Sequence, residues 1–260
     1  MFGIVGDPTE EVPEKLTTYD TRVRYQLDCF RKGIDGNTRN FMWSITSNEP
    51  TNFEYDYDQR GDLPVMEEKK AIMSSYGSRL AKPKDEFKGK IQRPQHDIVT
   101  TIFLQVHSHY LLNFLRSTIQ YTTTSPDDYA AGYFYYPYMD LFRHREEIEM
   151  YKTSKSETRS KHSDAYNEQC DKHIDVLLKY LDSLPMIRYA QMRLLQNKPQ
   201  SMVTFAGVAL LLKPLTNVYV HESGKLNAYV VDKLKGGVSY PTEITAPTKI
   251  DTYSIRIWNL

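Results

Sequence analysis

The sequence predicts a single α+β domain over residues 1–260, because the hydrophobic periodicity changes twice along the chain. Residues 1–94 form an irregular, strand-rich segment, residues 95–199 carry the three-and-four spacing of a helical layer, and residues 200–260 alternate like an antiparallel sheet. Because strands and helices are segregated along the chain, we expect antiparallel pairing rather than βαβ units. The content of 40% hydrophobic and 25% charged residues is typical of a globular protein.

The N-terminal third predicts a β-hairpin. Residues Arg22–Phe30 alternate loosely between apolar and polar side chains, as a half-buried strand does. A turn cluster, Gly33–Asn37, follows. We expect residues Phe41–Ile45 to pair back across this turn.

The middle of the chain predicts helices. One is expected within Gln95–Tyr121, where apolar side chains recur at spacings of three and four: Val99, Ile102, Phe103, Val106, Tyr110 and Phe114. Ser125 followed by Pro126 predicts a helix N-cap with proline in the first turn. Pro137 interrupts the next segment, so a second helix is expected from Tyr138 to about Tyr151.

A further pair of helices follows a polar loop. Residues Lys152–His162 contain no apolar side chain, which predicts a loop. Ser163 is a candidate N-cap for a helix that ends near Pro185. Its apolar stripe comprises Cys170, Ile174, Leu177, Leu181 and Leu184. Residues Met186–Asn197 predict one more short amphipathic helix.

The C-terminal segment contains the clearest hairpin signal in the chain. Two alternating runs, Asn217–His221 and Leu226–Val231, flank the turn sequence Glu222–Lys225. Alternation returns over Tyr253–Trp258. We therefore expect a strand near the end of the chain and an antiparallel sheet built around the hairpin.

The charge balance argues against a dedicated nucleic-acid or membrane-surface protein. Thirty-three Lys and Arg residues balance thirty-three Asp and Glu residues, whereas such proteins carry excess positive charge. The charge is nevertheless segregated: residues 1–20 hold five acids and one Lys (−4), and residues 79–94 hold six basic and two acidic side chains (+4). The basic segment is interpreted as a solvated linker, since it lacks the interleaved aromatic residues of an RNA-stacking surface.

The sequence does not predict secretion or a membrane span. The start of the chain becomes acidic after six residues, unlike a signal peptide. The longest apolar run, residues 205–212, is far shorter than the roughly 18 residues of a transmembrane helix. Two cysteines, Cys29 and Cys170, cannot build a disulfide framework. We expect a location in the cytoplasm or within a large intracellular or viral assembly.

Tyrosine is the one residue type in marked excess, with 20 of 260 residues. A tyrosine side chain combines a large apolar ring with a hydroxyl, which suits surfaces that are buried against a partner and remain partly wet. The proposed interface residues are Tyr129, Tyr133, Tyr135, Tyr136 and Tyr138, together with Tyr55 and Tyr57.

These observations favour a non-catalytic structural protein that works by self-association or by docking into a large complex. A viral shell component, an occlusion-type matrix protein or an accessory subunit would each fit. The zero net charge removes the self-repulsion that keeps many proteins monomeric. The expected partner is a second copy of the chain or a subunit of a larger assembly, and no cofactor is expected.

A metal-dependent hydrolase is the alternative interpretation. His144 is flanked by Asp140 and Glu147 at helical spacing, an arrangement that could form half of a carboxylate–histidine metal site or position a general base. Cys170 and His173 have the spacing of a partial zinc site or a nucleophile–base pair. The competing interpretation for each set is an ordinary structural role: His144 at the edge of a core face, and a buried Cys170 beside a partly exposed His173.

A calcium-loop pattern spans Asp56 to Glu67. It places Asp56, Asp58 and Glu67 at positions that supply oxygen ligands, but Arg60 stands where another oxygen ligand belongs. An acidic, solvated turn is the preferred interpretation. The chain contains no P-loop, dinucleotide-binding glycine motif, zinc-protease motif or nucleophile elbow, so the common nucleotide and hydrolase families are not indicated.

Overall fold

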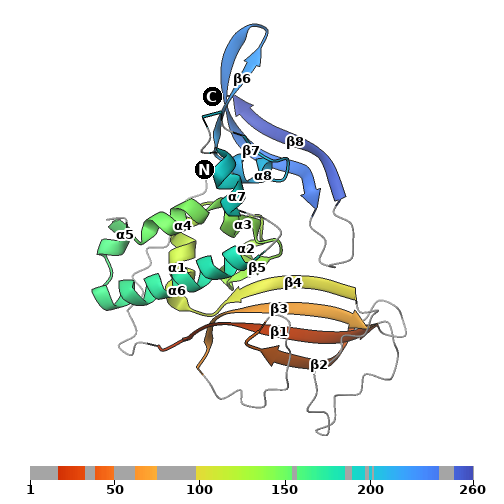
Figure 1. Ribbon diagram of the computed structural model, residues 1–260, viewed down its shortest axis with the longest axis vertical. Coiled ribbons are helices and arrows are strands. Elements are labelled where there is room, and N and C mark those ends of the chain that lie inside the picture. The colour runs from red at the N-terminus through yellow and green to blue at the C-terminus, as the bar shows by residue number, and fades with distance from the viewer. Residues whose placement is uncertain are drawn as a thin grey trace.

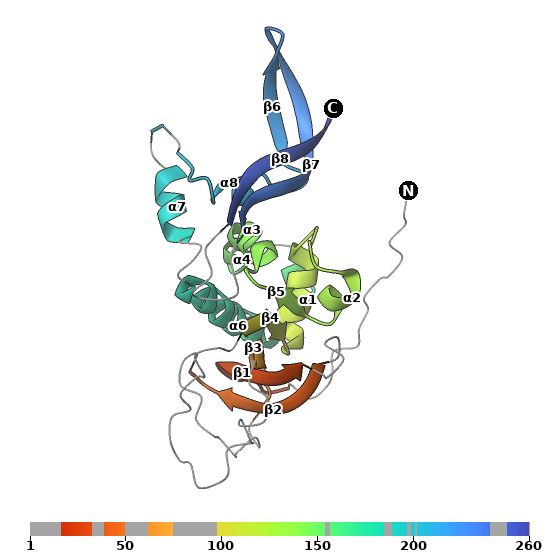
Figure 2. The ribbon, with the colours of Figure 1, turned by 90° about the vertical axis from the view of Figure 1, so that its right-hand side faces the viewer.

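The computed structural model confirms the α+β class, with a five-stranded mixed sheet, a helical layer and a three-stranded antiparallel sheet (Figure 1). The helical layer lies between the two sheets in both views (Figures 1 and 2). The structure describes residues 17–32, 39–49, 62–74, 98–153, 157–184, 189–196, 199–200, 202–239 and 249–259.

The first sheet has the strand order β2-β1-β3-β4-β5. Its strands are β1 (Asp20–Lys32), β2 (Arg39–Ser47), β3 (Pro64–Ser74), β4 (Ile98–Val106) and β5 (Tyr133–Tyr135). The predicted pairing of the first two strands is confirmed, with Leu27 opposite Ile45 in an antiparallel register. The pair β1–β3 is parallel, and the other neighbours are antiparallel.

The predicted helix over Gln95–Tyr121 is wrong in its first half. Residues Ile98–Val106 form β4, which pairs with β3 on one side and β5 on the other. β4 is apolar along most of its length, with Leu104 and Val106 buried in the core, and such a run also matches helical spacing. The helix α1 (His109–Thr118) begins only after the N-cap Ser108, whose side chain accepts a hydrogen bond from the Leu111 amide.

The remaining helices of this layer follow local sequence signals. They are α2 (Pro126–Ala130), α3 (Met139–Arg143), α4 (Arg145–Tyr151), α5 (Glu157–Ser160), α6 (Asp164–Ser183) and α7 (Tyr189–Gln196). Ser125 and Ser163 are N-caps, as predicted: their side chains accept hydrogen bonds from the amides of Asp128 and Tyr166.

Two details differ from the predicted helices. The segment expected to form one helix from Tyr138 to Tyr151 is divided at His144 into α3 and α4. Part of the expected loop at 152–162 forms the short helix α5. Both differences concern single turns, for which sequence patterns carry little information.

The main core lies between the helical layer and the first sheet. Helix α6 packs on β1 and β3, and α1 packs on α6 and β4 (Figure 1). The predicted stripe of α6 is buried at Cys170, Ile174, Leu177 and Leu181, and it meets Leu104 of β4 in the same cluster. A second, smaller cluster joins Leu27, Cys29, Ile45 and Ile72.

The C-terminal part consists of α8 (Val208–Leu211), β6 (Asn217–Glu222), β7 (Lys225–Ser239) and β8 (Lys249–Asn259). The predicted hairpin is confirmed, with Glu222 opposite Lys225. Ser223 and Gly224 between them both have positive φ, 51° and 79°, as a type I′ turn requires. The β6–β7 hairpin projects away from the helical layer (Figures 1 and 2).

Candidate functional site

The structure divides the predicted tyrosine interface between core and surface. Tyr138 is 1% exposed and belongs to the main core. Tyr129 is half-buried, and its hydroxyl donates to the Leu115 carbonyl at 3.1 Å. Tyr135 is 44% exposed, while Tyr133 and Tyr136 are half-buried. The segment therefore does not present one continuous tyrosine face.

Tyr138 belongs to a buried polar network under the helical layer. The Tyr180 hydroxyl of α6 donates to the Glu68 carboxylate of β3. The hydroxyls of Tyr180 and Tyr138 lie 3.1 Å apart, and the Lys70 ammonium lies 2.7 Å from the second Glu68 oxygen. The Tyr180 hydroxyl satisfies one oxygen of this almost fully buried carboxylate, and the other oxygen has only the ion pair with Lys70. These two tyrosines therefore have a structural role.

Several predicted residues lie outside the described part of the chain. They are Tyr55, Tyr57, Asp56, Asp58 and the basic segment 79–94. Glu67, the last residue of the calcium-loop pattern, is described and lies in β3.

Glu67 is buried and is committed to cationic partners. Its carboxylate lies 2.9 Å from Arg24 and 3.3 Å from Lys69, and His107 is 3.4 Å away. Burial alone would raise the pKa of Glu67, but the His107 hydrogen bond and the charges of Lys69 and Arg24 outweigh it and lower the pKa. Positively charged protein groups therefore already contact the Glu67 carboxylate at the positions that a calcium ion would take.

The His144, Asp140 and Glu147 set does not converge on one point. The Asp140 carboxylate accepts hydrogen bonds from the Thr122 hydroxyl at 2.6 Å and from the Thr123 amide at 2.8 Å. Glu147 pairs with the Lys213 ammonium. His144 donates through Nδ1 to the Asp140 carbonyl at 2.8 Å, and burial lowers its pKa. Each carboxylate is thus engaged by a protein donor other than the imidazole.

The Cys170 and His173 pair is also divided between different partners. The Cys170 thiol donates to the Tyr110 carbonyl at 3.8 Å, and burial raises its pKa to about 12. His173 Nδ1 lies 2.6 Å from the Ser108 hydroxyl, and burial lowers the pKa of His173 to about 4. A thiol held neutral beside a neutral imidazole is a poor nucleophile. Both cysteines are buried, and neither forms a disulfide.

The metal-site interpretation gains no support from this arrangement. Within the described ranges, no group of three or more His, Cys, Asp or Glu side chains is placed to hold a metal ion.

The C-terminal sheet carries an exposed apolar face. Tyr219, Leu226 and Trp258 are 69%, 65% and 62% exposed. The register places their side chains on one side of the sheet, because Tyr219 is opposite Ala228, Trp258 is opposite Val230, and Leu226, Ala228 and Val230 alternate along β7. We call this set the ribbon patch: Tyr219, Leu226, Ala228, Val230 and Trp258.

The hairpin also presents a regular strand edge. In the strand order β6-β7-β8, β6 is an outer strand, and its pairing with β7 has no bulge. Natural edge strands are usually protected by lysine, proline or a bulge, and the β6 sequence, NVYVHE, has none of these. β8, the opposite edge, has register shifts against β7 and carries Lys249 and Arg256.

The hydrogen-bonding groups of this edge follow from the turn. Glu222 and Lys225 close a two-residue turn, so they form a hydrogen-bonded pair. In an antiparallel ladder such pairs alternate, so Val220 and Val218 also bond to β7. The N–H and C=O groups of Asn217, Tyr219 and His221 therefore point to the outer side, where no described strand pairs with them.

The sequence of β6 carries a signal for this surface. A sheet with one solvated face alternates apolar and polar residues, whereas Val218, Tyr219 and Val220 are three consecutive apolar residues in a projecting hairpin.

Comparison of the chain with protein-family models, with curated proteins and with solved structures gave no match. The functional assignment therefore depends on the geometry. Within the described ranges, no helix combines the length and the apolar character that crossing a membrane requires.

Proposed function

We propose that this protein is a non-catalytic structural or assembly protein that associates with further copies of itself through its C-terminal sheet. The observation that carries the proposal is the unprotected edge of β6, which borders the ribbon patch. Exposed strand edges pair with other strands, and contiguous exposed apolar faces mark interaction sites. The occupant of this surface is a second copy of the chain.

The outward groups of β6 favour a two-fold pairing centred on Tyr219. An antiparallel register with Tyr219 opposite its own copy places Asn217 opposite His221 of the second copy. All three outward-pointing residues then meet outward-pointing residues, so each pair can exchange both backbone hydrogen bonds. The same patch is used on both copies, as a closed two-fold dimer requires.

Charge and side-chain direction are compatible with this pairing. Directly opposite residues lie on the same face of an antiparallel sheet, so the two ribbon patches become continuous and the two Tyr219 rings become neighbours. Glu222 is the single acidic residue of β6. The two Glu222 side chains lie three residues from the axis on opposite sides, roughly 20 Å apart at about 3.4 Å per residue, so they do not repel each other strongly in salt.

Sedimentation velocity at increasing protein concentration tests the proposal. The expected result is a shift from the 30.4 kDa chain to a species of twice that mass. Tyr219→Pro removes an outward N–H while leaving the ladder with β7 intact, because proline is tolerated on the free side of an edge strand. This variant should remain a monomer. The matched variant Tyr219→Phe keeps the backbone group and the ring and should associate like the unchanged chain.

A clean monomer at high-micromolar concentration would refute the proposal. Equal association of the unchanged chain and Tyr219→Pro would refute the use of this edge. Circular dichroism and the thermal midpoint of each variant show whether a change in mass reflects unfolding.

A further inference from the structure

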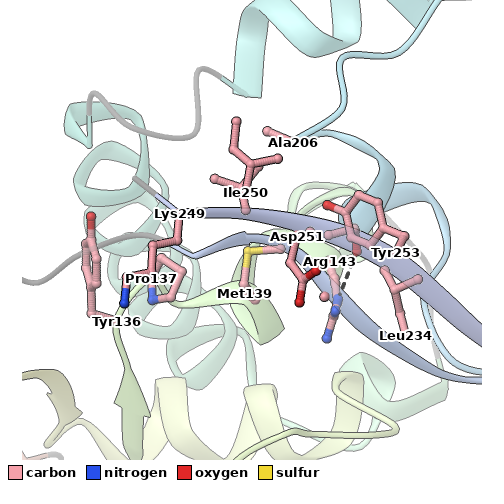
Figure 3. A pocket seen from close by; sticks show the side chains of 14 residues that line it. Tyr136, Pro137, Met139, Arg143, Ala206, Leu234, Lys249, Ile250, Asp251 and Tyr253 are labelled. Atoms are coloured by element: carbon pink, nitrogen blue, oxygen red, sulfur yellow. Dashed lines mark hydrogen bonds between the residues drawn. The ribbon is translucent and has the colours of Figure 1, made fainter. Parts of the chain in front are cut away.

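A cleft of about 870 Å³ separates α3 from the C-terminal sheet (Figure 3). Its lining includes Tyr136, Pro137 and Met139 from the segment that leads into α3, and Leu234, Ile250 and Tyr253 from the C-terminal sheet. A cleft of this volume at the junction of two structural layers, lined by both apolar and polar groups, has the dimensions of a small-molecule site. It is distinct from the outer edge of β6.

Arg143 supplies a constrained cation to this cleft. Its side chain is 9% exposed, and Nε donates to the Ala209 carbonyl at 3.1 Å, the bond drawn in Figure 3. The nearest carboxylate oxygen of Asp140 is 3.7 Å from Nη1, beyond hydrogen-bond distance. Within the described residues, the terminal nitrogens of Arg143 make no hydrogen bond, so their N–H groups remain available to an acceptor in the cleft.

Asp140 forms an ion pair with this guanidinium but no hydrogen bond, because its carboxylate is directed to threonine donors. The hydroxyls of Thr122 and Thr123 and the Thr123 amide all donate to it. The arrangement fixes the orientation of Arg143 without filling its donor positions.

Two further charged side chains line the cleft, both from β8. Figure 3 shows Lys249 toward the Tyr136 end and Asp251 toward the Arg143 end. Together with Arg143 they give the lining a net charge of +1. Arg143 is nine-tenths buried, whereas Lys249 and Asp251 are exposed and hydrated, so the desolvated Arg143 dominates recognition.

We propose that this cleft binds a small molecule that carries one carboxylate on a flat apolar body. The planar guanidinium matches a carboxylate with two parallel N–H donors. Tyr136, Pro137 and Tyr253 provide flat surfaces against which an aromatic or aliphatic body packs. The inference does not depend on self-association through β6.

Calorimetric titration with naphthoate, and with the neutral naphthylmethanol as its matched ligand, tests this site. Naphthoate should bind saturably to the full chain, and the neutral ligand should bind about tenfold more weakly, as expected for the loss of a charge-assisted hydrogen bond. Arg143→Gln should weaken naphthoate binding by about the same factor. Arg22→Gln, on the exposed start of β1, should leave binding unchanged.

A second pair of variants keeps the test independent of folding, because Arg143 also contacts α8. Ile250 lines the cleft and is 73% exposed, so its replacement does not disturb the core. Ile250→Asp should weaken naphthoate binding more than Ile250→Asn, because Asp and Asn have nearly the same shape and only Asp is charged. Asp251→Asn should strengthen naphthoate binding. Absence of saturable binding, equal affinity for the neutral ligand, or indifference to all of these changes would overturn the proposal.

Discussion

The buried hydroxyls of Tyr180 and Tyr138 should contribute unequally to stability, although both lie in one network. A phenol carries a single hydrogen, and that of Tyr180 is directed to the Glu68 carboxylate. Tyr138 is therefore the donor in the 3.1 Å contact between the two hydroxyls. Tyr180→Phe removes a hydrogen bond to a buried charge, whereas Tyr138→Phe removes a bond between neutral groups.

The expected difference follows from the partners that remain. After Tyr180→Phe, Glu68 keeps its ion pair with Lys70 but loses the hydroxyl donor, and the Tyr138 hydroxyl loses its acceptor. A hydrogen bond to a charged group contributes about 1.5–3 kcal/mol, and a neutral one about 0.5–1.5 kcal/mol. We expect Tyr180→Phe to lower the free energy of unfolding by about 2–4 kcal/mol and Tyr138→Phe by about 1 kcal/mol.

Urea denaturation monitored by circular dichroism measures both values, at a protein concentration low enough to keep the chain monomeric. The two variants differ from the natural chain by one oxygen atom each, so their packing volumes match. Equal losses for the two variants, or a larger loss for Tyr138→Phe, would refute this account of the network.

Two other predictions concern pH and backbone geometry. Because burial lowers the pKa of His173 to about 4 from an ordinary value of 6.5, the unfolded chain binds the extra proton first; stability should fall by about 1.4 kcal/mol per pH unit as the pH drops from 6.5 toward 4. His173→Gln should flatten the pH dependence of urea denaturation in that window. A Cβ on Gly236 would lie 2.0 Å from the Thr252 carbonyl oxygen, whereas one on Gly224 meets nothing within 4 Å, and both residues have a φ of 79°. Gly236→Ala should therefore lower the free energy of unfolding by about 1–3 kcal/mol more than Gly224→Ala does, and its thermal midpoint should be correspondingly lower. Similar midpoints for the two variants would contradict this geometry.

Sequence patterns predicted best those features that depend on neighbouring residues. Ser125 and Ser163 cap helices through amides three residues away, and Gly224 supplies the positive φ that the hairpin turn needs. These interactions are complete within a few residues, so local sequence determines them.

In β4, strand pairing determines the structure and the helical spacing of the sequence does not. Residues 98–106 match helical spacing, but they form a strand between β3 and β5. The five consecutive β-branched residues from Ile98 to Ile102 are a signal for a strand that the spacing alone obscured.

The candidate site depended on contacts that a single sequence does not reveal. Glu68 and Tyr180 are 112 positions apart, and only the fold shows that they meet. The five tyrosines of 129–138 lie within ten residues, yet Tyr138 faces the core and Tyr135 faces outward. The ribbon patch joins residues of three strands, whose common face follows from the register.

Residue-resolved amide hydrogen exchange at low and high protein concentration tests the proposed self-association most directly. Val218 and Val220 bond to β7 within one chain, so their amides should be protected at every concentration. The amides of Tyr219 and His221 point to the free edge and should gain protection only as dimers form. An alternating, concentration-dependent pattern along β6 is the predicted result. Association without added protection at Tyr219 and His221, or no association at all, would contradict the account.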